Sequence, residues 1–182
     1  MRQFLSLLIL LLSLQSQVSH GLEVSWLNQD KLQGQFTQEK HLAALSRPFV
    51  SHGEYLYSKE TGLQWHTLKP VNNYLLINKN GVSEKQADGQ YKILTSDTSF
   101  SALLLPIFSG DFETLKQHFS ISETNTGLTL KPLDQAVSDV MQSLELIISE
   151  QALQQITLYE ANGNLTQIYL RDNTQPAEHK TQ

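Results

Sequence analysis

The chain has 182 residues, no cysteine and a formal charge of −5. Without a thiol it can form no disulfide, no cysteine-ligated metal site and no catalytic thiolate. Its acidic balance and its lack of a basic run predict neither nucleic acid nor an anionic lipid surface as a partner.

Residues 1–21 have the pattern of an export signal. Arg2 precedes an apolar run over residues 4–14 that only serines interrupt, and this run is too short to span a bilayer. The small residues Ser19 and Gly21 predict cleavage after Gly21, and an uncleaved membrane anchor is the alternative. Because a bacterial lipoprotein needs a cysteine at its cleavage site, we expect no lipid anchor there. The remaining chain is long enough for one domain with a hydrophobic core.

The first half of the mature chain predicts consecutive antiparallel strands. A short helix is expected over residues 22–31, followed by strands over residues 32–42, 49–58, 63–70 and 74–78. These runs alternate apolar and polar side chains and are separated by Gly, Pro and Asn, which favour turns. Residues 82–88 are polar and predict a weak edge strand, and residues 90–95 predict one more strand.

Two helices, over residues 98–108 and 111–119, are expected to interrupt the strands. Strands resume at residues 120–122, 128–131, 143–149, 155–160 and 165–171, with a helix over residues 132–141. Ala161-Asn162-Gly163-Asn164 gives the clearest hairpin signal. The sum is an α+β fold with a strongly curved antiparallel sheet, an incomplete β-barrel of roughly ten strands, and helices that fill or cover its open face. Residues 173–182 form a polar C-terminal tail.

No catalytic or metal-binding constellation is visible. The histidines of the mature chain form no i, i+4 pair and no His-Glu-x-x-His pattern, so no metal site is expected. Ser109-Gly110-Asp111 invites a catalytic interpretation, but a helix N-cap at Asp111 explains it better. We expect no enzyme, no catalytic residue and no cofactor. A hydrolase of acyl esters is a weaker alternative, for which the sequence offers no nucleophile–base pair.

Residues 100–108 carry more apolar side chains than one helical stripe accommodates, so this segment should be buried on more than one side. It either plugs the core beneath the sheet or covers a cavity inside the curved sheet as a movable lid. In the second case Pro106 and the pair Ser109-Gly110 supply the breaks that let the lid swing. The expected lid residues are Phe100, Leu103, Leu104, Leu105, Ile107, Phe108, Phe112 and Leu115.

Four spaced motifs carry a resemblance to a known family. They read Gly34-Gln-Phe-Thr-Gln-Glu-Lys40, Arg47-Pro48-Phe49, Gly53-Glu-Tyr-Leu-Tyr57 and Gly62-Leu-Gln-Trp-His-Thr-Leu-Lys-Pro70. In this order they resemble the start of the outer-membrane lipoprotein carrier family (LolA and its relatives), in a divergent branch. The similarity continues through Gly110-Asp111 and residues 128–132 and 162–168, so it covers nearly the whole mature chain.

The resemblance implies a half-barrel domain over residues 22–172 that shields acyl chains from water. It implies a soluble, monomeric periplasmic carrier of a lipoprotein or lipid-like cargo, with an inner-membrane donor protein and an outer-membrane acceptor protein as partners. A non-enzymatic envelope assembly protein that docks partners on its curved sheet is the alternative. The expected cavity residues are Phe36, Tyr55, Tyr57, Leu63, Trp65, Leu75, Ile77, Leu144, Leu146, Ile148, Ile156, Leu158, Ile168 and Leu170.

One departure from the family pattern concerns the closed lid. In better-known members an arginine in the turn after the second strand hydrogen-bonds the lid, whereas this turn reads Ser58-Lys59-Glu60-Thr61. Lys59 supplies a point charge but not the bidentate geometry of a guanidinium. The cargo is therefore left open between a lipoprotein and a free lipid or polyene.

Overall fold

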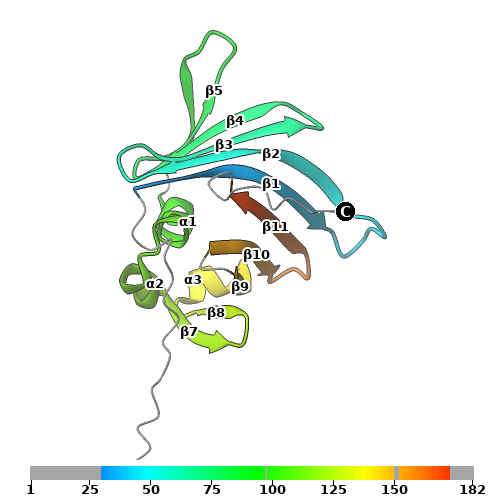
Figure 1. Ribbon diagram of the computed structural model, residues 1–182. Helices are drawn as coiled ribbons and strands as arrows, with labels where there is room; N and C mark the ends of the chain where they lie inside the picture. Colours follow the sequence, from blue (N-terminus) through cyan, green and yellow to red (C-terminus); the bar gives the residue numbers. More distant parts are fainter. Residues whose placement is uncertain (1–29, 97, 150–151, 173–182) are drawn as a thin grey trace, which may run out of the picture.

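The structure, a computed structural model, describes residues 30–96, 98–149 and 152–172. Within these residues, eleven strands form one antiparallel sheet that curves around helix α1 (Figure 1). The expected α+β incomplete barrel is confirmed, with one strand more than the approximate ten expected for it.

The chain runs through the sheet in two arms that meet where β1 pairs with β11. The first arm contains β1 (Lys31–His41), β2 (Phe49–Ser58), β3 (Gly62–Lys69), β4 (Asn73–Asn78), β5 (Gly81–Lys85) and β6 (Tyr91–Thr95). The second contains β7 (Phe119–Thr124), β8 (Gly127–Pro132), β9 (Met141–Ser149), β10 (Ala152–Glu160) and β11 (Leu165–Asp172). The spatial order is β6-β5-β4-β3-β2-β1-β11-β10-β9-β8-β7, and the barrel stays open between β6 and β7.

A glycine lets two aromatic rings meet across β2. Phe36 of β1 pairs with Gly53 of β2, and its ring stacks on Trp65 of β3 with ring centroids 3.8 Å apart. A Cβ on Gly53 would lie 2.6 Å from the Phe36 ring and 2.1 Å from the carbonyl oxygen of His66. The missing side chain therefore makes room for this part of the core, which explains a glycine inside a strand.

Helices α1 (Ser99–Ser109) and α2 (Phe112–His118) connect the two arms, and α1 lies against β4 and β5 on the inner side of the sheet (Figure 1). The chain turns between them at Gly110, whose φ of 67° is left-handed. Asp111 caps α2 as predicted, because the Thr114 backbone N–H donates to its Oδ1 at 3.0 Å. However, α1 continues through Pro106, so the break expected there is wrong.

Two further expectations differ from the structure. The polar run at residues 82–88 is not an edge: β5 lies between β4 and β6, because the chain folds back after Lys85 and adds β6 outside it. The helix expected over residues 132–141 is limited to α3 (Gln135–Ser138), since residues on both sides are taken by β8 and β9. Leu133 and Val140 are consequently 59% and 66% exposed instead of lying on a buried stripe.

The export segment at residues 1–21, most of the helix expected over residues 22–31 and the tail at residues 173–182 lie outside the described residues. Of the expected first helix only its last residues are described, and there Lys31 begins β1.

Candidate functional site

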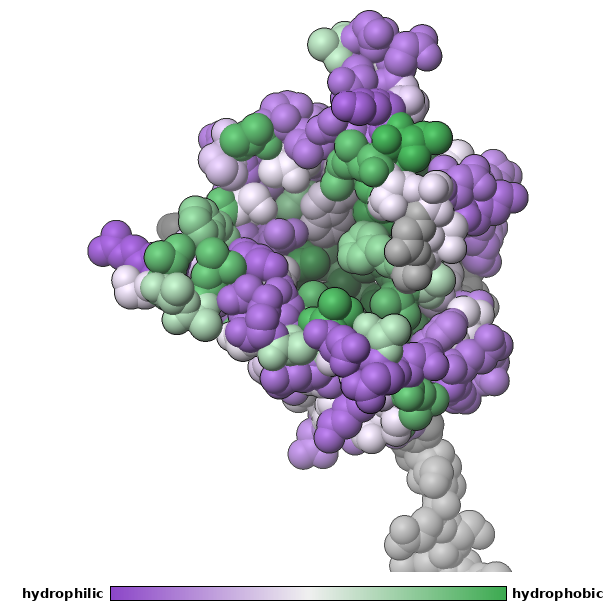
Figure 2. All heavy atoms as spheres, turned by 180° about the vertical axis from the view of Figure 1, so that it is seen from behind, coloured by the Kyte–Doolittle hydropathy of each residue, from purple (hydrophilic) through white to green (hydrophobic). Residues whose placement is uncertain are grey.

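An apolar pocket lies between α1 and the inner face of the sheet. Its volume is about 290 Å³. Figure 2 shows this side of the molecule hollowed, with hydrophobic residues on the floor of the hollow and polar residues around it. The lining residues are Gln38, Trp65, Leu75, Ile77, Phe100, Leu103, Leu104, Ile107, Phe108, Met141, Leu144, Ile156, Leu158, Thr166 and Ile168.

The two ends of α1 are held differently. At its C-terminal end Ile107 and Phe108 are each 1% exposed, whereas Phe100 at the other end is 54% exposed. At the start of the helix, the side chain of the N-cap residue Thr98 makes no capping hydrogen bond, and the first turn contains no acidic residue. Because the Thr98 side chain does not cap the first turn and Phe100 is only partly packed there, this turn can separate from the sheet at a lower free-energy cost than the last turn.

Tyr55 and Tyr57 hold the C-terminal end of α1 instead of lining the pocket. Their ring centroids lie 5.7 Å and 6.3 Å from that of Phe108, and both side chains are buried. Burial, with a smaller effect from the charge of Asp172, raises the pKa of the Tyr55 phenol well above its ordinary value. The Tyr55 phenol therefore stays neutral, and the rings of both tyrosines form the aromatic surface on which this end of the helix packs.

The structure divides the expected cavity residues between the pocket and the packed core. Of the expected cavity residues, the pocket contains Trp65, Leu75, Ile77, Leu144, Ile156, Leu158 and Ile168. Those that belong to the packed core or its margin are Phe36, Tyr55, Tyr57, Leu63, Leu146, Ile148 and Leu170. Of the expected lid residues, Phe100, Leu103, Leu104, Ile107 and Phe108 line the pocket, whereas Leu105, Phe112 and Leu115 pack against the core.

Three pocket residues were missed: Gln38, Met141 and Thr166. Alternation could have found two of them, because Gln38 shares a strand face with Phe36 and Thr166 shares one with Ile168. Met141 was assigned to a helix that ends before it. Gln38 and Thr166 were missed because their side chains are polar, and polar side chains are not expected in an apolar cavity.

The polar groups of the pocket lie toward one end of the half-barrel. Lys40 forms an ion pair with Glu160, and the Thr166 hydroxyl donates to Glu160 at 3.2 Å. Burial favours the neutral acid, but the hydrogen bond and charge of Lys40, with hydrogen bonds from Asn164 and Thr166, outweigh it and lower the pKa of Glu160. This network joins β1 to the β10–β11 hairpin beside Gln38.

Lys59 does not contact α1 through its charge. Its Nζ lies 2.9 Å from Oδ1 of Asp30, and its backbone N–H donates to the Asp30 carbonyl at 3.2 Å. The residue in the turn after β2 therefore fixes the start of β1, and the structure does not place it as a substitute for the lid-binding arginine.

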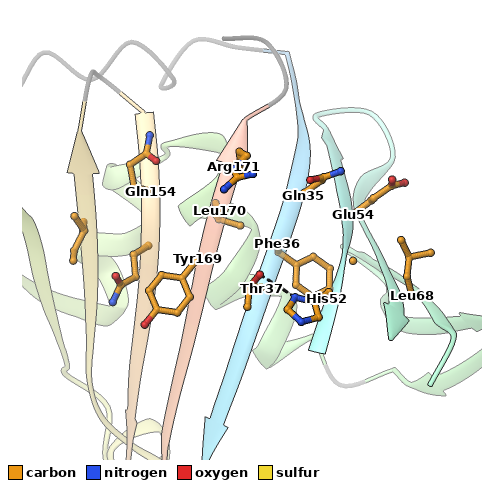
Figure 3. Close-up of a pocket in the computed structure, with 13 residues that line it drawn as sticks. Gln35, Phe36, Thr37, His52, Glu54, Leu68, Gln154, Tyr169, Leu170 and Arg171 are labelled. Atoms are coloured by element: carbon orange, nitrogen blue, oxygen red, sulfur yellow. Dashed lines mark hydrogen bonds between the residues drawn. The ribbon is translucent and has the colours of Figure 1, made fainter. Parts of the chain in front are cut away.

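A larger depression, of about 550 Å³, lies on the outer face of the sheet. Figure 3 shows its side chains extending from β1, β2, β3, β10 and β11, with the helices behind the strands. Thr37 and His52 hydrogen-bond across it, with 3.0 Å between Oγ1 and Nδ1. Because Gln35, Glu54 and Arg171 also line it, this groove does not suit an acyl chain.

The described residues contain no group of three or more His, Asp or Glu side chains placed to hold a metal ion. In the same part of the chain, no helix combines the length and hydrophobicity needed to cross a bilayer.

Known proteins resemble this chain in fold and in one family pattern. A LolA superfamily protein from Nitrosomonas europaea is 11% identical, with a TM-score of 0.46 over 85% of this chain and 91% of that chain. MucB, solved in complex with MucA(peri), is 15% identical, with a TM-score of 0.40 over 81% of this chain and 53% of MucB. No curated protein sequence is significantly similar. The family model described as outer membrane lipoprotein carrier protein LolA matches residues 28–181, and the chain therefore belongs to the LolA family.

Proposed function

We propose that this protein carries the acyl chains of a lipoprotein or a lipid-like cargo in the pocket under α1, through the periplasm toward the outer membrane. Membership of a family of periplasmic carrier and binding proteins supports a carrier role and no enzymatic one. The observation that carries the proposal is the apolar pocket whose one wall is the weakly held first half of α1. Export by residues 1–21, an inner-membrane donor, an outer-membrane acceptor and a monomeric state belong to the same proposal.

The size of the pocket indicates that α1 moves when cargo binds. At about 290 Å³ it is at the lower limit of small-molecule sites, which run from about 300 to 1,000 Å³. A chain of about 16 carbons gains on the order of 12 kcal/mol gross on leaving water. Lifting the first half of α1 exposes the partly buried Leu103 and Leu104, at up to about 3 kcal/mol each. The remaining affinity is moderate, which lets a carrier release its cargo.

The polar pocket residues set the direction in which cargo enters. Gln38 and Thr166 lie near the end of the half-barrel where β1 ends and β11 begins, and Ile77 lies deeper, opposite Leu63. The acyl tail would point toward Ile77, with its ester or amide carbonyl near the Gln38 amide. A polar group on the wall then pairs with the only polar atoms of the buried part of the cargo.

Leu104→Asp tests the carrier role, because it places a carboxylate on the pocket wall at a position that is only partly buried. We expect loss of fluorescent fatty-acid binding with a small change in melting temperature. Leu133→Asp is the matched control, since Leu133 is 59% exposed and does not line the pocket. Trp65 is a poor test position, because it stacks on Phe36 and its loss would also unfold the core.

Native mass spectrometry of protein recovered from the periplasm gives the direct readout. A bound lipid or acyl peptide that Leu104→Asp abolishes supports the carrier role. If neither protein retains an acylated molecule and both bind the fatty acid equally, the pocket is not a cargo site and the role as an assembly protein is favoured.

A further inference from the structure

Five exposed apolar side chains and two cations gather at one end of the half-barrel, and we infer that they dock the protein on a phospholipid bilayer with anionic headgroups. This surface, the rim patch, goes beyond the carriage of cargo, since it concerns where cargo is exchanged. It comes from the β1–β2 connection and the β3–β4 turn. The rim patch consists of Leu45, Arg47, Phe49, Val50, Leu68, Lys69 and Val71.

The pairing of the strands brings these residues together. Phe49 and Val50 begin β2, next to Lys40 and Glu39 at the end of β1. Lys69 at the end of β3 pairs with His52 of β2, so the turn that follows it lies at the same end of the sheet. The β1–β2 connection is tied down, because the Ala43 backbone N–H donates to Oδ1 of Asn164 at 3.1 Å.

The apolar residues of the rim patch are unusually exposed for their type. Val71 is 72% and Phe49 is 61% exposed, and Leu45, Leu68 and Val50 are between 40% and 50% exposed. At the opposite end of the half-barrel, the described turns at residues 59–61, 79–80 and 125–126 contain no exposed large hydrophobic residue. An exposed apolar cluster on one rim only is typical of an interaction surface and not of random surface composition.

The charge of the rim patch selects its partner. Residues 42–50 and 68–72 contain Arg47 and Lys69 and no Asp or Glu, although the whole chain carries −5. Glu160 at the end of β10 is already paired with Lys40. Apolar side chains flanked by exposed cations match the interface of a bilayer with anionic headgroups, where the apolar groups insert and the cations bind phosphates. The excess of positive charge is confined to the two connections, because Glu39 pairs with Val50 and Glu54 lines the same outer depression as Leu68.

The rim patch is continuous with the entrance of the pocket. Phe49 lies on the inner face of β2, two residues before Ser51, which pairs with Gln38 of the pocket wall. A protein docked by the rim patch would hold the polar end of its pocket at the headgroups, so that an acyl chain could pass between bilayer and pocket with little exposure to water. This consequence rests on the proposed function, whereas docking itself does not.

Vesicle co-sedimentation tests the docking, with protein recovered from the periplasm and its N-terminus established by mass spectrometry. The vesicles contain phosphatidylcholine with or without phosphatidylglycerol. We expect Phe49→Ser/Val71→Ser to weaken binding about tenfold or more, and Lys69→Glu to remove the preference for phosphatidylglycerol and the salt dependence. The matched control is Ile93→Ser/Leu94→Ser on β6, which removes equally exposed apolar groups outside the rim patch and should bind as the unmodified protein does.

Fatty-acid binding, measured with a monomeric fluorescent fatty acid in the absence of vesicles, separates this inference from the proposed function. The docking is overturned if the rim-patch variant, the β6 variant and the unmodified protein bind vesicles equally. This holds whether or not the protein binds the fatty acid. Absence of vesicle binding in all three also overturns it and favours a protein partner for the rim patch. Rim-dependent vesicle binding without fatty-acid binding leaves the docking in place and refutes the carrier.

Discussion

The hydroxyl of Ser101 offers a sensitive test of whether α1 opens. Ser101 is 1% exposed on the α1 helix that packs on β4 and β5, and no described group hydrogen-bonds to its Oγ. A buried hydroxyl without a partner opposes the closed position of the helix, because water would satisfy it once the helix lifts. Ser101→Ala removes this opposition and also raises helix propensity.

The magnitude follows from the two contributions. Replacing serine by alanine inside a helix gains about 0.5 kcal/mol, and removing an unpaired buried hydroxyl gains about 1 kcal/mol. A gain of about 1.5 kcal/mol should raise the melting temperature by roughly 3–6 °C for a domain of this size. If cargo enters only when this part of α1 lifts, the same free energy opposes binding and weakens it about tenfold.

Thermal melts and titration with a fluorescent fatty acid measure the two effects on one sample. Ser109→Ala is the control on the same helix, because the Ser109 hydroxyl already donates to the Pro106 carbonyl at 3.3 Å and its removal should not stabilise the protein. An unchanged or lower melting temperature for Ser101→Ala would refute the assignment of an unpaired hydroxyl. A higher melting temperature with unchanged affinity would refute the opening of α1 at this position.

Three other predictions concern stability and can be checked by melting curves. Asp111→Ala should lose about 1 kcal/mol with its cap on α2, while Asp111→Asn should retain most of it. The pKa of Glu160 is lower in the folded protein, so its pair with Lys40 contributes its full stability above the ordinary value near 4.5 and loses it as pH falls through the folded pKa. Glu160→Gln should therefore reduce the loss of melting temperature in acid. An unchanged dependence of melting temperature on pH would contradict the pair. Gly53→Ala should destabilise by at least about 3 kcal/mol, because its Cβ meets the Phe36 ring and backbone, and a stable variant would contradict the packing.

Local patterns predicted the strands well where punctuation was strong. The boundaries of β2 were predicted correctly because Pro48 precedes it and a polar turn ending at Gly62 follows it. The hairpin at Ala161-Asn162-Gly163-Asn164 was predicted for the same reason. Between Pro132 and Met141 no Gly or Pro marks a boundary, and the apolar periodicity predicted one long helix. Because β8 ends at Pro132 and β9 begins at Met141, only a short helix fits between them.

The sequence predicts which side chains share the inner face of the sheet, but not which of them α1 covers. Alternation shows that Tyr55 and Trp65 point to the same side of the sheet, and both do. It does not show that Phe108, far along the chain, covers Tyr55 and leaves part of Trp65 in the pocket. Only about half of the expected cavity residues therefore line the pocket, because the core and the packing of α1 bury the others.

The sequence by itself determined the alternation that gives the sheet an apolar inner face, the concentrated apolar segment at residues 100–108, and the absence of a motif for catalysis. These properties depend on neighbours along the chain, and local chemistry is sufficient to predict them. Only the tertiary structure decided which inner residues α1 covers, and which loops meet at the rim beside the pocket. Both depend on contacts between segments many residues apart, and strand order and helix packing set those contacts, not the composition of either segment.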